Sequence, residues 1–221
     1  RRRGRVSGNA TARLPLKPLL GYTAGHMNAE LFESGFEVGT YIENLRNYRS
    51  FVRGLTAEAT ADPQHIEQLS TAAGSLAQPV RISVMTEDWC GDSACNIPIL
   101  DSLCQGAGIS LRIFRGSETP QLEKRYHADG VDHIPVVSVW NGDFEEAARW
   151  IECPAAVEEQ KDAWKADHPE FMDLYRRREK DKEAAKQFAT LYRTFLEEMG
   201  RWYKEGMWSE TTREIVEAVA R

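Results

Sequence analysis

The stretch Trp89-Cys90-Gly91-Asp92-Ser93 contains the residue types that can do covalent chemistry in this chain. Cys90 follows a stretch that predicts a strand and precedes one with helical spacing, so we expect it at the first turn of a helix. Unpaired backbone N–H groups and the helix dipole stabilise a thiolate there and can lower the thiol pKa. Because the thiolate is the form that attacks disulfides, the stretch predicts a thiol site.

A sheet and its helices are expected to position this cysteine. Four stretches have strand propensity: 80–85, 110–114, 135–140 and 144–150. Helical spacing separates the first three, at 92–104 and from Thr119-Pro120 through Tyr126. Asn141-Gly142 predicts a two-residue hairpin between the last two strands. A βαβ unit followed by a hairpin predicts an α/β fold, with a mixed sheet and helices on both faces.

The thiol stretch and a later proline together resemble the thioredoxin family. That family carries the motif W-C-G-P-C, a helix proline five residues after the second cysteine, and a cis proline that faces the first cysteine. The matching residues here are Trp89, Cys90, Gly91, Pro98, Ile134 and Pro135. The resemblance covers about residues 78–153 and implies a thioredoxin-like mixed sheet with flanking helices. The W-C-G-D motif is similar to that of a divergent branch of the family with a CxxS-type site.

Two departures from the family motif change the expected chemistry. Ser93 replaces the second cysteine, so glutathione or a partner thiol would have to release a mixed disulfide from Cys90. Ser93 can still donate a hydrogen bond to the thiolate. Asp92 replaces the family's proline, and a carboxylate beside the thiolate should raise the Cys90 pKa. An acid at a helix start also suits the helix dipole, which is an equally good structural reading.

A third departure concerns proton transfer. Val84 stands where thioredoxins carry a buried acid in the strand before the motif. Glu87 and Asp88 are near in sequence, but we expect them to be more exposed. The usual aid to proton transfer is therefore missing.

The resemblance also implies roles for the matching positions. It implies a catalytic set of Cys90, Ser93 and Pro135. It implies a substrate groove made by Trp89, Gly91, Asp92, His133 and Ile134. His133 directly precedes Ile134-Pro135, which places it near the thiol as an acid–base group or, the favoured reading, as a loop histidine without a role.

The other cysteines predict no disulfide framework. Cys95 lies about 140° around the helix from Cys90, so a disulfide would need the first turn to open. We expect Cys95 to be a small buried hydrophobe, with a resolving thiol as the alternative. Cys104 is expected in the core and Cys153 as a free structural thiol. A metal site of Cys90, Cys95 and His133 has no standard zinc spacing, so no metal is expected.

The chain ends differ from the centre in composition. Residues 1–20 carry six basic residues and no acid, although the whole chain has a net charge of −6. Such an extended basic arm (1–27) predicts contact with nucleic acid or an acidic partner in a larger assembly. The alternatives are a disordered tail, a transit-peptide remnant or an expression scar. The location expected is cytoplasmic, or an organelle matrix if the segment is a transit remnant.

Helical segments are expected on both sides of the thioredoxin-like core. We predict N-terminal helices over 28–77, with helical spacing at 28–55, then the core at 78–153 and a C-terminal helical extension at 154–221. In the extension, Gly206 is expected to break a long aromatic helix and Ser209 to cap a last one. No apolar run approaches the roughly 18–20 residues that a membrane span requires.

Two functions remain open on the sequence. The first is a monothiol oxidoreductase that acts on protein or glutathione disulfides through Cys90, with no cofactor and with glutathione as a candidate co-substrate. The second is a catalytically weak binding or assembly module that docks onto a larger complex through its basic arm and helical extensions. The joint presence of Cys90, Gly91 and Pro135 favours the first.

Overall fold

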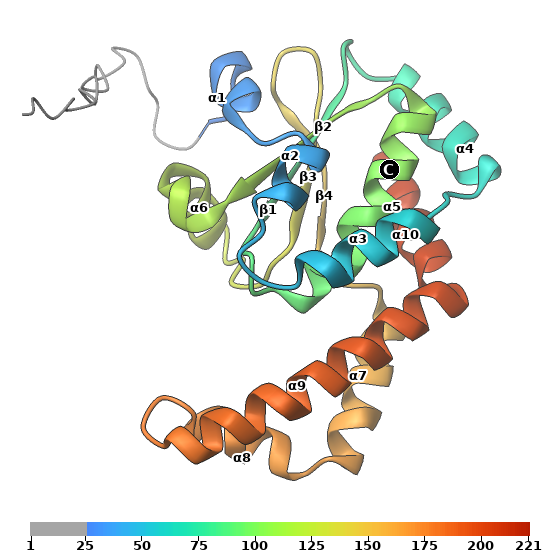
Figure 1. The fold of residues 1–221 in the computed structure, drawn as a ribbon. Helices are drawn as coiled ribbons and strands as arrows, with labels where there is room; N and C mark the ends of the chain where they lie inside the picture. Colours follow the sequence, from blue (N-terminus) through green and yellow to red (C-terminus); the bar gives the residue numbers. More distant parts are fainter. Residues whose placement is uncertain (1–25) are drawn as a thin grey trace, which may run out of the picture.

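The computed structural model describes residues 26–221, so the basic segment 1–20 and its expected contacts lie outside the described residues. A four-stranded sheet of order β2-β1-β3-β4 forms the centre of this part. Its strands are β1 (Arg81–Thr86), β2 (Ser110–Arg115), β3 (Val136–Trp140) and β4 (Glu146–Ile151). β1 pairs with β2 in parallel, and the other two pairings are antiparallel. The predicted α/β class with a mixed sheet and flanking helices is confirmed (Figure 1).

Helices precede, connect and follow the strands. The α-helices are α1 (Ala29–Ser34), α2 (Val38–Glu43), α3 (Arg49–Glu58), α4 (Pro63–Gly74), α5 (Gly91–Ala107), α6 (Pro120–Ala128), α7 (Ala155–Asp167), α8 (Glu170–Arg177), α9 (Lys182–Trp202) and α10 (Trp208–Val219). Two short helical turns, η1 (Gly116–Glu118) and η2 (Tyr203–Met207), complete the set. Across residues 26–221, no helix combines the length and apolarity that a membrane span needs.

Alternation along β1 divides the core in two, because successive side chains in a strand point to opposite faces. Ile82 and Val84 belong to the larger hydrophobic cluster, which the helices α2 to α5 and α10 share. Met85 belongs to a smaller cluster on the other face, under α1 and α6. Figure 1 shows α6 and α1 on one side of the sheet and α5 on the other. The helix that carries the thiol motif therefore packs against the larger core.

Helix α5 is held by the helices that follow the sheet. Pro98 lies inside α5 and removes one N–H from its hydrogen-bond ladder. Near this point, the Trp208 indole N–H donates to the Cys95 carbonyl at 2.9 Å. The Asn96 side-chain amide donates to the Tyr203 hydroxyl at 2.8 Å. The C-terminal extension is thus fixed to the motif helix by buried polar contacts as well as by apolar packing.

The helical spacing at 28–55 corresponds to three separate helices, α1, α2 and α3. Gly35 ends α1, and a Cβ at this position would lie 2.5 Å from the Phe114 ring. Tyr48 has a φ of 56° at the start of α3, a left-handed conformation that separates α3 from the chain before it. The contact of Gly35 with β2 and the left-handed Tyr48 set where these helices end and begin.

The predicted two-residue hairpin at Asn141-Gly142 is wrong. Residues 141–145 connect β3 to β4, the Asn141 N–H donates to the Glu145 carbonyl at 3.0 Å, and Phe144 has a φ of 61°. Gly142 lets this connection pack closely against the backbone of residues 77–78. Its N–H donates to the Ala77 carbonyl, and a Cβ would lie 2.2 Å from the Gln78 carbonyl oxygen.

The end of the chain confirms one helix signal and corrects another. Gly206 has a φ of 147° inside η2 and interrupts the long helix, as predicted. The predicted cap at Ser209 is wrong, because α10 already begins at Trp208 and has no side-chain cap. The aromatic residues of α9 pack against one another and against α7 and α8.

We predict opposite effects for two glycine substitutions. Gly142→Ala forces a Cβ into the 77–78 backbone and should lower the free energy of unfolding by about 1–3 kcal/mol. Gly54→Ala, in the middle of α3 with open space around it, should raise that free energy by about 0.5–1 kcal/mol. Urea unfolding followed by circular dichroism measures both, and equal effects would contradict the close approach at Gly142.

Candidate functional site

Cys90 is the N-cap residue of α5. β1 ends at Thr86, and the Cys90 N–H donates to the Glu87 carbonyl at 3.0 Å in the turn that follows. The Cys90 Sγ accepts the Ser93 N–H at 3.4 Å, which is one of the unpaired N–H groups at the helix start. The structure therefore places this sulfur at the beginning of the helix, as the spacing predicts. The residue is only 6% exposed.

The Ile134–Pro135 peptide is cis and lies opposite the thiol. The Cys90 thiol donates to the Ile134 carbonyl oxygen at 3.4 Å. Residues 44 positions apart in the sequence thus meet at one sulfur atom. A carbonyl oxygen that faces the sulfur favours the protonated thiol, because it would repel a thiolate.

Burial raises the pKa of Cys90 to about 11. The Asp92 carboxylate raises the pKa further, in the direction that the sequence predicts, while hydrogen bonds from Ser93 lower it. A helix start alone would lower a thiol pKa, but here desolvation outweighs that effect. Burial and Asp92 thus favour the protonated thiol, and they act against the stabilisation that a helix start gives a thiolate.

Asp92 forms a buried ion pair with Lys161 of α7. Lys161 Nζ lies 3.3 Å from the Asp92 carboxylate, and its side chain is 6% exposed. Burial raises the Asp92 pKa to about 6, and Lys161 opposes this rise. Sequence reasoning missed Lys161. Its signal was a lysine at helical spacing between the apolar Val157 and Trp164, on the side of α7 that faces the core.

Lys161 also contacts a second group of potential ligands. Glu152, Cys153 and Glu158 are, among the described residues, the group whose acidic and thiol atoms lie within 4.8 Å of one another. Lys161 Nζ donates to Glu152 at 3.0 Å, to Glu158 at 2.9 Å and to the Cys153 sulfur at 3.6 Å. The lysine ammonium therefore occupies the position that a metal ion would need.

His133 and Trp89 lie at the exposed margin of the site. His133 Nδ1 lies 3.2 Å from a Glu152 carboxylate oxygen, and its side chain is 70% exposed. The structure therefore pairs this histidine with an acid, and His133 is absent from the described metal-type clusters. Trp89 is 60% exposed and presents a large apolar surface next to Cys90.

Ser93 and Cys95 are both sealed inside the protein. Ser93 is 1% exposed, and the Thr86 hydroxyl donates to its Oγ in a short hydrogen bond. Cys95 is completely buried, and burial raises its pKa well above the usual value. All four cysteines are free. Cys95 and Cys104 occupy core positions as expected, and the Cys153 thiol donates to Glu158 at 3.3 Å.

Asp88 is buried, which corrects the expectation that it is exposed. It is 6% exposed, and Arg115 Nε donates to its carboxylate at 2.7 Å from the end of β2. Arg115 is itself 4% exposed and also donates to the Asn44 carbonyl at 3.0 Å. This ion pair joins the motif turn to the loop after α2. Val84 is completely buried, so no acid lies at the strand position where the family carries one.

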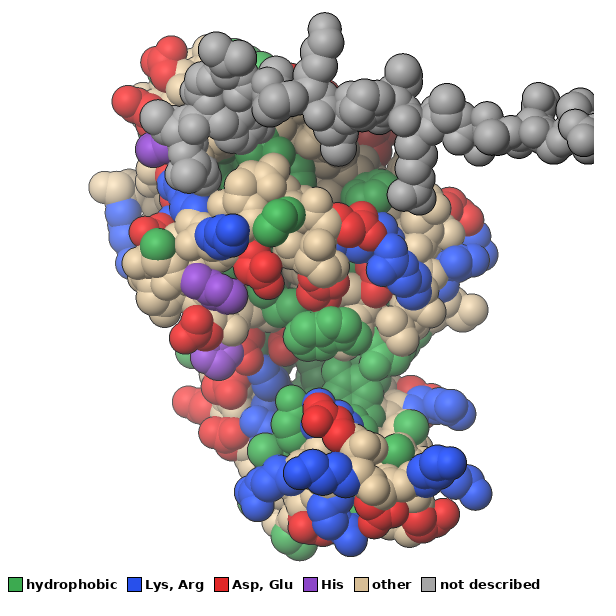
Figure 2. Space-filling model, turned by 90° about the vertical axis from the view of Figure 1, so that its left-hand side faces the viewer, with side chains coloured by type: hydrophobic (Ala, Val, Ile, Leu, Met, Phe, Trp, Pro, Cys, Tyr) green, Lys and Arg blue, Asp and Glu red, His purple; other side chains and the backbone are tan. Residues whose placement is uncertain are grey.

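Helix α9 covers the motif from the other side. A Cβ on Gly91 would lie 2.8 Å from the Tyr192 hydroxyl and 3.3 Å from Leu196. The Tyr192 ring lies 6.0 Å from the Tyr48 ring. Behind the thiol, a cavity of about 10 Å³ has room for at most one water molecule. Figure 2 shows hydrophobic side chains gathered at the waist between the sheet-containing body and the helical arm formed by α7, α8 and α9.

Comparison with known proteins agrees with this architecture. A family model described as thioredoxin matches residues 38–165, which is more than half of the chain. The crystal structure of a protein of unknown function, PA1234 from Pseudomonas aeruginosa, is 17% identical, with a TM-score of 0.50. That alignment covers 86% of this chain and 95% of the other. At this identity the likeness shows the fold alone.

A second solved structure is that of an HIV epitope-scaffold protein. It is 22% identical and has a TM-score of 0.47. The alignment covers 58% of this chain and 78% of the scaffold. Comparison with curated proteins gives no match.

We predict that Lys161→Met destabilises the protein strongly. The substitution leaves the Asp92 carboxylate buried without its cation, so the free energy of unfolding should fall by about 3–5 kcal/mol. Lys165→Met, one turn further along α7 in an exposed pair with Asp162, should change it by less than about 1 kcal/mol. Urea unfolding at pH 7.5 measures both.

The double variant Lys161→Met/Asp92→Asn tests whether the unpaired Asp92 carboxylate causes the stability loss in Lys161→Met. Since it removes both charges, it should recover much of the stability lost in Lys161→Met. If the double variant loses the sum of the two single effects, the ion pair is not what stabilises this contact.

Proposed function

This chain belongs to the thioredoxin family, and on that premise we propose that it is a monothiol thiol–disulfide oxidoreductase that acts through Cys90. The observation that carries the proposal is the position of the Cys90 sulfur, at the N-terminus of α5 and 3.4 Å from the carbonyl of the cis Ile134–Pro135 peptide. We assign the W-C-G-D motif to a divergent branch of the family with a CxxS-type site.

The reaction begins with the thiolate of Cys90. It attacks one sulfur of a substrate disulfide, the S–S bond breaks, and the other sulfur leaves as a thiolate that takes up a proton from solvent. A mixed disulfide remains on Cys90. Ser93 has no sulfur to release it, and Cys95 is sealed in the core, so a protein thiol or glutathione must attack the adduct.

Neighbouring groups support each stage of this proposal. The Ser93 N–H stabilises negative charge on the sulfur. Pro135 holds the Ile134 backbone against the thiol, where it offers an edge to an extended substrate. Trp89 forms the entrance, and its exposed ring gives a substrate apolar surface to contact. Gly91, which the resemblance places in the groove, is buried beneath Tyr192 of α9.

The neutral, buried thiol favours a second candidate function, a binding or assembly module with weak catalysis. At pH 7, a thiol with a pKa of about 11 is ionised in roughly one molecule in ten thousand. The helical arm then gives a large docking surface outside the core. Exchange at Cys90 separates the two candidates.

We predict that Cys90→Ser abolishes disulfide exchange. With bis(2-hydroxyethyl) disulfide as substrate and dithiothreitol as reductant, the rate should fall at least about 100-fold, because the serine hydroxyl is not a nucleophile for disulfides. Cys153→Ser, at the half-buried cysteine, should retain the rate within about twofold. Equal rates for Cys90→Ser and the unmodified protein would favour the binding module.

The pH dependence of Cys90 alkylation gives a further prediction. Because the thiol pKa is raised to about 11, the iodoacetamide rate should rise about tenfold per pH unit from pH 7 to pH 10. Asp92→Asn removes a neighbouring negative charge and should increase the rate at pH 8 about three- to tenfold. A rate that levels off near pH 8 would contradict the raised pKa.

A further inference from the structure

Three carboxylates converge on one ammonium beside the thiol. Lys161 Nζ lies 3.3 Å from Asp92, 3.0 Å from Glu152 and 2.9 Å from Glu158. These acids come from α5, from the residue after β4 and from α7. A single ammonium cannot neutralise three carboxylates, so two negative charges remain. Protonation of His133, which contacts Glu152, would still leave one.

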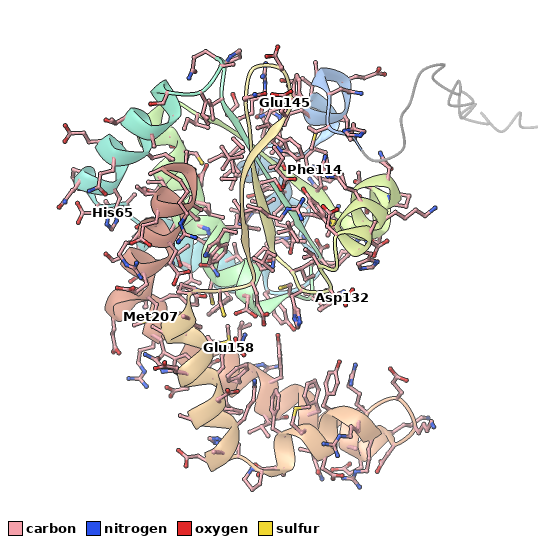
Figure 3. The ribbon with its side chains drawn as sticks, turned by 180° about the vertical axis from the view of Figure 1, so that it is seen from behind. His65, Phe114, Asp132, Glu145, Glu158 and Met207 are labelled. Carbon is pink, nitrogen blue, oxygen red and sulfur yellow. The ribbon has the colours of Figure 1, made fainter. Side chains whose placement is uncertain are left out.

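This charge lies next to the reacting sulfur. The Glu152 N–H donates to the Pro135 carbonyl at 2.8 Å, one residue beyond the carbonyl that faces Cys90. Asp92 is two residues from Cys90 in the first turn of α5. Figure 3 shows Glu158 and Asp132 at the same end of the sheet, where the body meets the helical arm.

The charged residues on the other side of the thiol do not neutralise the net negative charge of the carboxylates around Lys161. Asp88 is paired with Arg115, and Arg46 is paired with Asp88 and with Glu118, so that group is balanced. Glu87 accepts hydrogen bonds from the N–H and hydroxyl of Ser117. These partners carry no charge, so Glu87 adds to the negative side.

We infer that Cys90 exchanges preferentially with neutral and cationic disulfides, such as a polypeptide disulfide flanked by lysine or arginine, and that it discriminates against anionic disulfides such as glutathione disulfide. This inference rests on the proposed function. In each case the Cys90 thiolate forms a bond to one sulfur, the substrate S–S bond breaks, and the second sulfur leaves as a thiolate. The same field disfavours glutathione as the thiol that resolves the adduct, which points to a protein thiol for that step.

Three small disulfides of different charge test the inference on the unmodified protein. They are cystamine (two positive charges), bis(2-hydroxyethyl) disulfide (neutral) and glutathione disulfide (net negative). The rate of adduct formation at Cys90 is measured at pH 8.5 by mass spectrometry, with fragmentation to locate the adduct. Each rate is divided by the rate of the same reagent with 2-mercaptoethanol, a neutral thiol, which removes the intrinsic reactivity of the reagent.

We expect the corrected cystamine rate to exceed that of glutathione disulfide at least about tenfold in 20 mM salt, and the ratio to fall towards 1 in 500 mM salt. Glu152→Gln/Glu158→Gln should lower the ratio at low salt. The matched control Glu67→Gln should leave it unchanged. Glu67 lies on α4, where the neighbouring Ile66 packs against Gly106 at the opposite end of α5 from Cys90.

The outcomes separate the inference from the proposed function. If the neutral disulfide forms no adduct at Cys90, the proposed function fails and the inference fails with it. If the neutral disulfide reacts but glutathione disulfide is as fast as cystamine, or the ratio is insensitive to salt, the inference alone is overturned. The salt series needs no substitution, so a variant that fails to fold does not weaken the test.

Discussion

The first turn of α5 is buried beneath the helices that follow the sheet, and this burial controls the rest of the site. Tyr192 packs against Gly91 and Lys161 pairs with Asp92, so both residues are largely shielded from water. An excluded helix start still offers its N–H groups to an anion, but the loss of hydration is larger than that gain at Cys90. The thiol is therefore neutral, although its position in the fold is one that favours a thiolate when it is open to water.

The same burial explains why a lysine from α7 is part of the site. Asp92 stands where related motifs have proline, and a buried carboxylate without a cation would take up a proton or destabilise the fold. Lys161 provides the cation, but it also contacts Glu152 and Glu158. The arrangement keeps Asp92 in place and leaves a net negative charge around the sulfur. The negative charge that raises the pKa of Cys90 therefore also acts on any substrate that approaches it.

Family membership leaves the activity of this chain open, because the scaffold and the chemistry are separable. The opposition of Cys90 and the cis Ile134–Pro135 peptide is present. The second sulfur is replaced by Ser93, which is fixed by Thr86 and cannot resolve an adduct. An oxidoreductase with this geometry depends on an external thiol, and a binding module does not. The two proposals therefore differ in the access and ionisation of one sulfur atom, since the backbone around it is the same in both.

The sequence alone determined the features that arise from local patterns. The strand–cysteine–helix order and the Thr119-Pro120 helix start each depend on residues within a few positions of one another, and each occurs in the structure. Motif resemblance added the proline that faces Cys90, because two separated signatures occur in the right order.

Only the tertiary structure decided which charges are buried and which local patterns are overridden. Asp88 is buried because Arg115 reaches it from β2, and Lys161 meets Asp92 across 69 residues. The Asn141-Gly142 turn is lengthened where Gly142 packs against the chain near Gln78. In each case the outcome depends on burial and on contacts with residues far apart in the sequence. The residues next to each position do not show either of these.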